Sequence, residues 1–231
     1  MEKTFLFNED PMAAMENIPG GLFDMVLIRL PDPNETKRWT SPIPLSDFVE
    51  LNGERYEYSG YLKLMHLGGL SSAQAKAFWQ DFCQEGVLKK CKDVLKPDGV
   101  VIALSTDVAS QYIEENKQIP LREVHYWYKS RSMLEEAPVE KIMVFSLYSP
   151  CQKGSRELPK NLMYLPSYKN CGKDRGEMPT PLLKNILQTY TLPGQRVLDF
   201  TAESHVFAEL CGQSGRNYVG ISKNCKMDKI Y

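Results

Sequence analysis

Two stretches of the sequence place side chains that could do chemistry at the end of an apolar, strand-like run. The first follows the run Phe23–Ile28 and reads Arg29-Leu30-Pro31-Asp32. The second closes the run Val197–Phe200 and reads Asp199-Phe200-Thr201-Ala202-Glu203-Ser204-His205. A histidine suggests a general base, but the spacing assigns His205 no acidic or nucleophilic partner. We therefore expect a structural role for Asp199 at its strand end and no catalytic role for His205.

A third stretch, residues 151–179, is rich in basic and aromatic residues. Between Lys153 and Arg175 it has six basic residues against two acidic ones, with two tyrosines among them. Lysine and arginine neutralise phosphates and aromatic rings stack on bases, so this pattern predicts a DNA-binding surface. The alternative is a solvated loop. The candidate DNA-binding residues, including two basic residues after the strand-like Tyr126–Tyr128, are Lys129, Arg131, Lys153, Arg156, Lys160, Tyr164, Tyr168, Lys169, Lys173 and Arg175.

The segments that must position these residues alternate between strand-like and helix-like patterns. The expected strands are Thr4–Phe7, Phe23–Ile28, Val100–Leu104, Val124–Tyr128, Ile142–Phe145, Val197–Phe200 and Tyr218–Ile221. The expected helices are Pro11–Ile18, Ser71–Lys96, Pro181–Tyr190 and Val206–Cys211, with loops over 31–61 and 151–179. This alternation predicts an α/β fold with a doubly wound, mostly parallel sheet and helices on both faces. Ligands of such folds bind at the carboxyl ends of the strands, which is where the chemistry-bearing stretches lie.

The composition is that of an ordinary globular protein. The chain has 231 residues, of which 42% are hydrophobic and 25% charged, and its net charge is −1. These values exclude a disordered chain, a collagen and a coiled-coil rod, and they favour a single domain over 1–231. No apolar run approaches the length of about 20 residues that a membrane span needs. With six cysteines outside CxxC pairs and three histidines, we expect reduced thiols, no metal site and a cytoplasmic location.

Several segments together resemble a known family. They are LFNEDPMAAMENIPGGLFDMVLIRLPDPN, FWQDFCQEGVLKKCKDVLKPDGVVIAL, VHYWYKS, PVEKIMVFS, EMPTPLLKNILQTYTLPGQRVLDF and GRNYVGIS. In this order they are similar to the permuted DNA amino-methyltransferases, which methylate N6 of adenine or N4 of cytosine and in which the catalytic half precedes the cofactor half. The resemblance covers nearly the whole chain. It implies a Rossmann-like methyltransferase sheet in permuted order, with residues 151–179 in the place of the target-recognition element.

The catalytic motif of that family is altered here. The family's Asp-Pro-Pro-Tyr provides acceptors for the target amino group and a ring that stacks on a flipped base. The matching residues are Arg29, Leu30, Pro31 and Asp32, so the acceptor has become a donor-only cation and the ring a carboxylate. An acceptor shifted to Asp32-Pro33 is an alternative.

The cofactor motif is altered in the same way. The family's glycine-rich loop approaches S-adenosylmethionine, but Glu203 and His205 stand at its two glycine positions. Their side chains would project into the space that the cofactor needs, and the acidic residue that holds its ribose is replaced by Ser222. The remaining positions of this degenerate pocket are Asp199, Phe200 and Ala202. We therefore expect no bound cofactor.

These losses predict a methyltransferase-like protein without catalytic activity. We expect it to bind DNA, or to serve as a regulatory or structural subunit, and to act alone, as a homodimer or beside an active methyltransferase. DNA binding would associate it with the nucleoid. The alternative hypothesis is an active S-adenosylmethionine-dependent DNA amino-methyltransferase with remodelled motifs. Asp32 or Glu203 remade for another cofactor or reaction would be a further enzymatic alternative.

Overall fold

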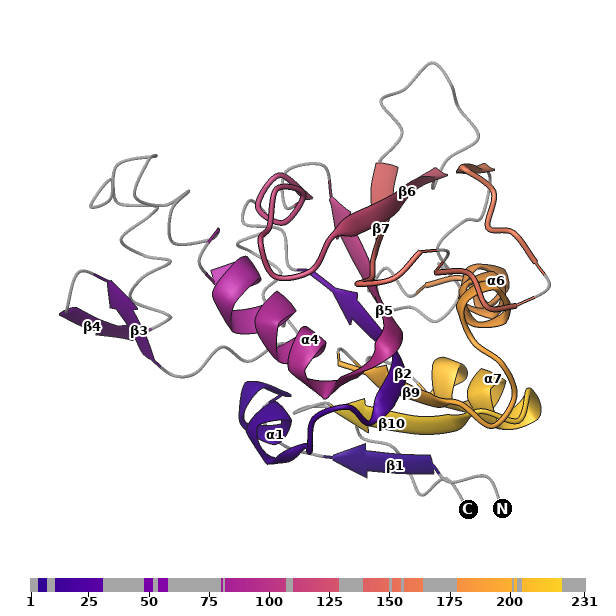
Figure 1. Ribbon diagram of the computed structural model, residues 1–231, viewed down its shortest axis with the longest axis horizontal. Coiled ribbons are helices and arrows are strands. Elements are labelled where there is room, and N and C mark those ends of the chain that lie inside the picture. Colours follow the sequence, from indigo (N-terminus) through magenta and orange to yellow (C-terminus); the bar gives the residue numbers. More distant parts are fainter. Residues whose placement is uncertain are drawn as a thin grey trace, which may run out of the picture.

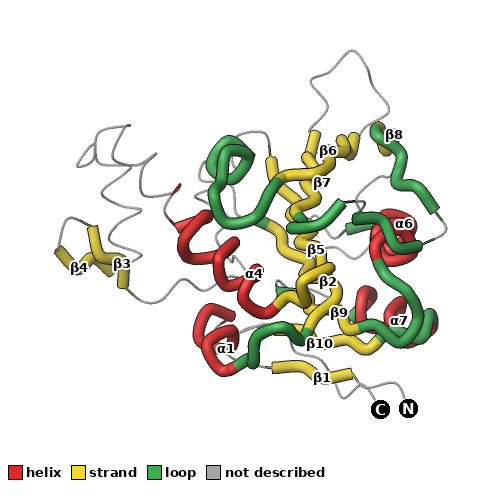
Figure 2. Tube along the Cα trace, in the orientation of Figure 1, coloured by secondary structure: helices red, strands yellow, loops and turns green. Residues whose placement is uncertain are grey.

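The computed structural model gives the chain an eight-stranded sheet with helices on both faces (Figure 1, Figure 2). It describes residues 4–7, 11–30, 48–51, 54–57, 80, 82–106, 110–128, 139–149, 151–154, 156–163, 178–200, 202 and 205–221. In spatial order the strands are β1 (Thr4–Phe7), β10 (Asn217–Ile221), β9 (Arg196–Asp199), β2 (Phe23–Arg29), β5 (Leu95–Thr106), β7 (Val139–Phe145), β6 (Leu121–Tyr128) and β8 (Asn161–Met163).

Most of the strands are parallel. The neighbours β1, β10, β9, β2 and β5 all run in one direction. Strand β7 is antiparallel to both β5 and β6, and β8 is parallel to β6. All strands except β7 therefore end at the same edge of the sheet, which we name the carboxyl edge; the opposite edge is the amino edge. The predicted doubly wound, mostly parallel Rossmann-like sheet is confirmed, with the single reversal at β7.

Helices cover the two faces of this sheet. On one face lie α1 (Pro11–Asn17), the π-helix η1 (Phe82–Leu88) and α4 (Lys89–Val94). On the other face lie α6 (Thr180–Tyr190) and α7 (Val206–Gln213), and Figure 1 shows α1 and α4 across the sheet from α6 and α7. The helices on each face pack on a separate cluster of buried, mostly apolar residues. None of the helices in the described part of the chain is long and apolar enough to cross a membrane.

Strand β2 has the unbroken apolar sequence of a central strand because it is covered on both faces. Val26 and Ile28 pack in the cluster under α4, whereas Met25 and Leu27 pack in the cluster under α6 and α7. All four side chains have 0% exposure. The polar exception, Asp24, accepts hydrogen bonds from a neighbouring lysine and a backbone N–H, so its burial is compensated.

Three boundaries differ from the expectations. The helix expected over Ser71–Lys96 ends at Val94, because Leu95 is extended and pairs with Phe23 as part of β5; Ser71 itself lies outside the described residues. The loop expected over 31–61 contains the hairpin β3 (Phe48–Leu51) and β4 (Glu54–Glu57). The loop expected over 151–179 contains β8, whose three residues are too short to show a strand period.

Candidate functional site

The two chemistry-bearing strand ends lie side by side at the carboxyl edge. Strands β2 and β9 are parallel neighbours, with Leu27 opposite Asp199, and the Phe200 N–H donates to the Leu27 carbonyl at 2.9 Å. Chain order reverses between them, since β9 continues through α7 to β10 on one side and β2 pairs with β5 on the other. This reversal is where open α/β sheets bind ligands. The fold therefore brings the two chemistry-bearing stretches together at one edge of the sheet.

Arg29, at the end of β2, is fixed by an ion pair that sequence analysis did not anticipate. Its Nη2 lies 2.7 Å from Oε1 of Glu140 on β7, with side-chain exposures of 23% and 4%. Strand β5 lies between the two residues, so the guanidinium extends across it. Leu30 follows, 4% exposed, and its N–H donates to the Leu104 carbonyl at 2.8 Å. The remaining residues of the motif, Pro31 and Asp32, lie outside the described residues.

Arg29 also lies close to the end of β9. Alternation along β2 places Arg29 and Leu27 on the same sheet face, and Leu27 pairs with Asp199 on β9. The order across the sheet is therefore the carboxylate of Asp199 on β9, the guanidinium of Arg29 on β2 and the carboxylate of Glu140 on β7. The signal for Glu140 in the sequence was a single acidic residue near the start of an apolar strand, and that signal alone does not indicate its partner.

Asp199 is buried and receives a hydrogen bond from a residue of the neighbouring strand β10. It is 3% exposed, and its Oδ2 accepts a 3.0 Å hydrogen bond from the Tyr218 hydroxyl. The Tyr218 ring packs edge-on against Phe207 of α7, with centroids 6.1 Å apart. It also lies over Gly220, where an added Cβ would come within 2.5 Å of the tyrosine hydroxyl. This contact is consistent with the structural role expected for Asp199.

The residues after Asp199 separate into buried and exposed ones. Phe200 and Ala202 have 0% exposure, and the Ala202 N–H donates to the Ile221 carbonyl at 3.2 Å. The His205 side chain is 62% exposed at the start of α7, and its Nε2 is 3.8 Å from Oε1 of Glu209. Its φ of −77° is an ordinary helical value, so the histidine causes no backbone strain there. Glu203 and Ser222 lie outside the described residues.

Of the candidate DNA-binding residues, Lys153 lies at the amino edge, away from the site. Its Nζ donates to Oδ2 of Asp98, near the start of β5, at 2.9 Å, and its side chain is 15% exposed. That hydrogen bond holds the pKa of Asp98 below its ordinary value. Lys153 is therefore engaged within the protein, whereas Arg156 and Lys160 are exposed to solvent.

The segment that follows runs along β6 from the amino edge to the carboxyl edge. The Tyr126 N–H donates to the Lys160 carbonyl at 2.9 Å, and β8 continues parallel to β6 as far as Met163. Helix α6 begins at Thr180 and ends at the amino edge, so it starts toward the carboxyl edge. Strand β8 therefore ends toward the carboxyl edge and α6 begins toward it, and the stretch 164–177 connects the two in the sequence. Seven of the candidates lie outside the described residues: Lys129, Arg131, Tyr164, Tyr168, Lys169, Lys173 and Arg175.

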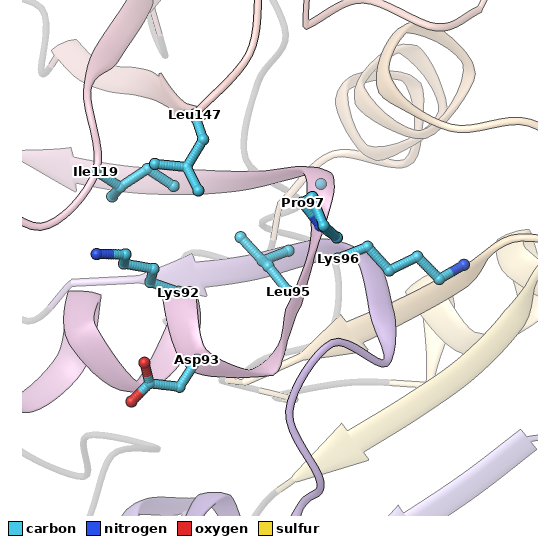
Figure 3. A pocket seen from close by; sticks show the side chains of 8 residues that line it. Lys92, Asp93, Leu95, Lys96, Pro97, Ile119 and Leu147 are labelled. Carbon is cyan, nitrogen blue, oxygen red and sulfur yellow. The ribbon is translucent and has the colours of Figure 1, made fainter.

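A hollow of about 310 Å³ lies at the amino edge instead (Figure 3). Its apolar lining includes Leu95, Ile119 and Leu147, and Lys92 and Asp93 lie on its α4 side. It is far from the ends of β2 and β9 and brings no cluster of polar groups together. Within the described residues, no three His, Cys, Asp or Glu side chains are grouped so that they could hold a metal ion.

Comparison with known proteins relates this fold to enzymes that act on DNA. No protein-family model and no curated protein matches the chain. Among solved structures, it is similar to the cytosine-N4-specific PvuII DNA methyltransferase, with 13% identity, a TM-score of 0.66, and coverage of 97% of this chain and 83% of that one.

Two further structures have the same fold. TTHA0409 of Thermus thermophilus, described as a candidate DNA modification methylase, is 14% identical, with a TM-score of 0.61 and coverage of 99% and 91%. The complex of M1.HpyAVI with SAM is 12% identical, with a TM-score of 0.54 and coverage of 96% and 95%. At these identities the likeness shows the fold: the chain has the Rossmann-like fold of DNA methyltransferases.

Proposed function

We propose that this chain is a DNA-binding protein that keeps the methyltransferase fold and does not transfer methyl groups. The observation that carries the proposal is the Arg29–Glu140 ion pair at the end of β2. In the family that the sequence resembles, this position holds the acceptor for the target amino group. A guanidinium has only hydrogen-bond donors, so it cannot accept from an amino group or orient its lone pair.

The described residues at the carboxyl edge also differ from what S-adenosylmethionine requires. Asp199 is 3% exposed and already accepts from Tyr218. His205 stands where the family has a glycine. These residues do not fit the cofactor, and we derive no methyl-transfer step for them.

DNA binding is supported by where the basic residues of 151–179 are attached. The chain has a net charge of −1, so attraction to DNA must come from a local cluster. Lys169, Lys173 and Arg175 belong to the stretch 164–177. The strand before it, β8, ends toward the carboxyl edge, and the helix after it, α6, begins toward this edge, where Arg29 and Asp199 also lie. The similar solved structures are described as DNA methyltransferases. We infer that the chain binds DNA although it does not transfer methyl groups to it.

The test is the binding of a short fluorescent DNA duplex, followed by anisotropy at increasing salt. We expect binding that weakens with salt, and replacement of Lys169, Lys173 and Arg175 by alanine should reduce the slope of log K against log salt by about 3. The matched control replaces Lys89, Lys90 and Lys92 on α4, which should leave the slope unchanged. Absence of binding at low salt would contradict the proposal and favour a structural subunit, which co-purification with an active methyltransferase would reveal.

A further inference from the structure

A partly buried cluster at the amino edge gathers four polar side chains around a single carboxylate. Oε2 of Glu123, on β6, accepts from the Tyr190 hydroxyl at 2.7 Å and from Gln152 Nε2 at 3.1 Å, and it lies 3.0 Å from His125 Nε2. Its Oε1 accepts from the Cys151 thiol at 2.9 Å. These partners come from β6, from the segment after β7 and from the last residue of α6. Glu123 therefore links three parts of the chain that are distant in sequence.

The chemistry of these groups indicates a positioning role. Burial and the hydrogen bond to Glu123 raise the pKa of the Cys151 thiol to about 12, so the thiol stays protonated and donates at neutral pH. The same two causes raise the pKa of Tyr190 well above its ordinary value. Burial raises the pKa of Glu123, but the hydrogen bonds with its partners, Cys151 and Tyr190 first, outweigh burial and lower it. Glu123 is thus an ionised acceptor for the protonated Cys151 and Tyr190.

The backbone beside this cluster is held as closely as its side chains. The N–H groups of Lys153 and Gly154 donate to the Thr189 carbonyl of α6 at 3.0 and 2.8 Å. Gly154 contacts the helix so closely that an added Cβ would collide with the Gln188 carbonyl. Farther along, the Pro159 carbonyl lies 3.0 Å from His125 Nδ1. The segment 151–159 therefore contacts α6 and β6 at its first residues and β6 again at its last residue.

This segment leads directly to the basic residues of the proposed DNA surface. Arg156 lies on it, and Lys160 follows it directly and precedes β8, which runs to the carboxyl edge. The position of 151–159 on β6 sets where β8 starts. Because the side-chain pattern of a strand has a period of two, a shift of one residue would reverse the faces of β8.

We infer that Glu123 is a positioning residue for DNA recognition: it holds the segment 151–163 in place on β6 without contacting DNA itself. This inference rests on the proposed function, because it supposes that the segment leads into a DNA-binding surface. No pattern in the sequence indicates a role for Glu123. His125 contacts both parts of the structure, since its Nε2 lies 3.0 Å from Glu123 Oε2 and its Nδ1 lies 3.0 Å from the Pro159 carbonyl oxygen.

The first arm of the test uses the full chain without DNA. Glu123→Gln replaces an acceptor oxygen by an NH₂ donor that faces other donors, so the segment should loosen. We expect trypsin to cleave after Arg156 and Lys160 at least about tenfold faster, as for the loss of a charged hydrogen bond. Cleavage after Lys184, inside α6, reports global unfolding and should change much less. The control Glu115→Gln alters an exposed carboxylate outside this segment, between β5 and β6, and should cleave as the wild type does.

A pair of variants at Cys151 tests whether the donors matter. Cys151→Ser keeps a hydrogen-bond donor to Glu123 and should retain the protection of Arg156 and Lys160. Cys151→Ala removes the donor and should partly lose that protection. Equal cleavage in both variants, or unchanged cleavage in Glu123→Gln, would overturn the inference.

The second arm measures the affinity for a fluorescent DNA duplex. We expect Glu123→Gln to weaken DNA binding at least about tenfold, since a mobile segment must be ordered on binding, and Glu115→Gln to leave it unchanged. Faster cleavage with undiminished DNA affinity would show that the anchor serves stability alone and would overturn the inference. If the wild-type protein binds no DNA, the proposed function fails and this inference fails with it, while the cleavage arm separately decides whether Glu123 anchors the segment.

Discussion

Arg29 Nη2 lies 2.7 Å from Glu140 Oε1, and this contact joins β2 to β7 across the whole width of β5. The positive charge of Arg29 is neutralised within the protein by this contact. Glu140 is the more buried partner, with a side-chain exposure of 4%. The pair can therefore be tested by its effect on stability.

The first prediction is that the two residues are energetically coupled. Arg29→Met leaves a buried carboxylate without its cation and should lower the free energy of unfolding by about 3 kcal/mol, the lower end for buried pairs because Arg29 keeps some contact with water. The double variant Arg29→Met/Glu140→Leu removes both charges and should lie within about 1 kcal/mol of the wild type. Denaturant unfolding of Arg29→Met, Glu140→Leu and the double variant measures this coupling. Additive losses would show that the two charges do not interact.

The second prediction concerns the stability that Glu123 contributes at different pH values. The pKa of this carboxyl is lowered in the folded chain, so its contribution is complete above the unfolded value of about 4.3 and is lost as pH falls through the folded value. The stability difference between wild type and Glu123→Gln should therefore be constant near neutral pH and shrink below about pH 4. Urea unfolding of both proteins from neutral to acidic pH measures it. A difference that grows in acid would contradict this sign.

The third prediction separates two lysines of the basic segment. Lys153 is paired with Asp98, whereas Lys160 is exposed where the chain enters β8. Lys160→Ala should weaken DNA binding and reduce the salt slope by about 1, whereas Lys153→Ala should leave the slope nearly unchanged. Anisotropy titrations at several salt concentrations distinguish them. An equal loss in the two variants would place the amino edge in contact with DNA.

The fourth prediction concerns the close packing of β10 beneath Asp199. Gly220→Ala puts a Cβ within 2.5 Å of the Tyr218 hydroxyl, so the ring must shift and its hydrogen bond to Asp199 weakens. We expect a loss of about 1–3 kcal/mol in unfolding free energy. In a Tyr218→Leu background, where no ring lies over Gly220, the same Gly220→Ala change should cost less than it does in the wild type. No loss in the single variant would show that the strand end adapts without cost.

The sheet could be predicted from the sequence because its central strands are buried on both faces. The apolar runs at Phe23–Ile28 and Val197–Phe200 fixed the positions of β2 and β9, and general rules for α/β folds placed their ends together. The helix boundary at Val94 was missed because Leu95 and Val94 are both apolar and fit either a helix or a strand. The antiparallel β7 was missed because apolar periodicity does not show strand direction.

The contacts of the candidate site were less predictable. The sequence identified Arg29 as an altered position, but its partner Glu140 is 111 positions away and follows only from the order of the strands. The same reason hides the cluster around Glu123, whose donor Tyr190 is 67 positions away. Lys153 was grouped with the other basic residues because charge counts do not show ion pairs within the fold.

We propose above that this protein binds DNA and does not transfer methyl groups, and a single assay measures both properties. The purified protein is incubated with unmethylated DNA and S-adenosylmethionine carrying a labelled methyl group, and label and protein are then measured on the recovered DNA. We expect the protein to be retained on the DNA at low salt and no label to be incorporated. Label in the DNA, absent from a sample without protein, would contradict it.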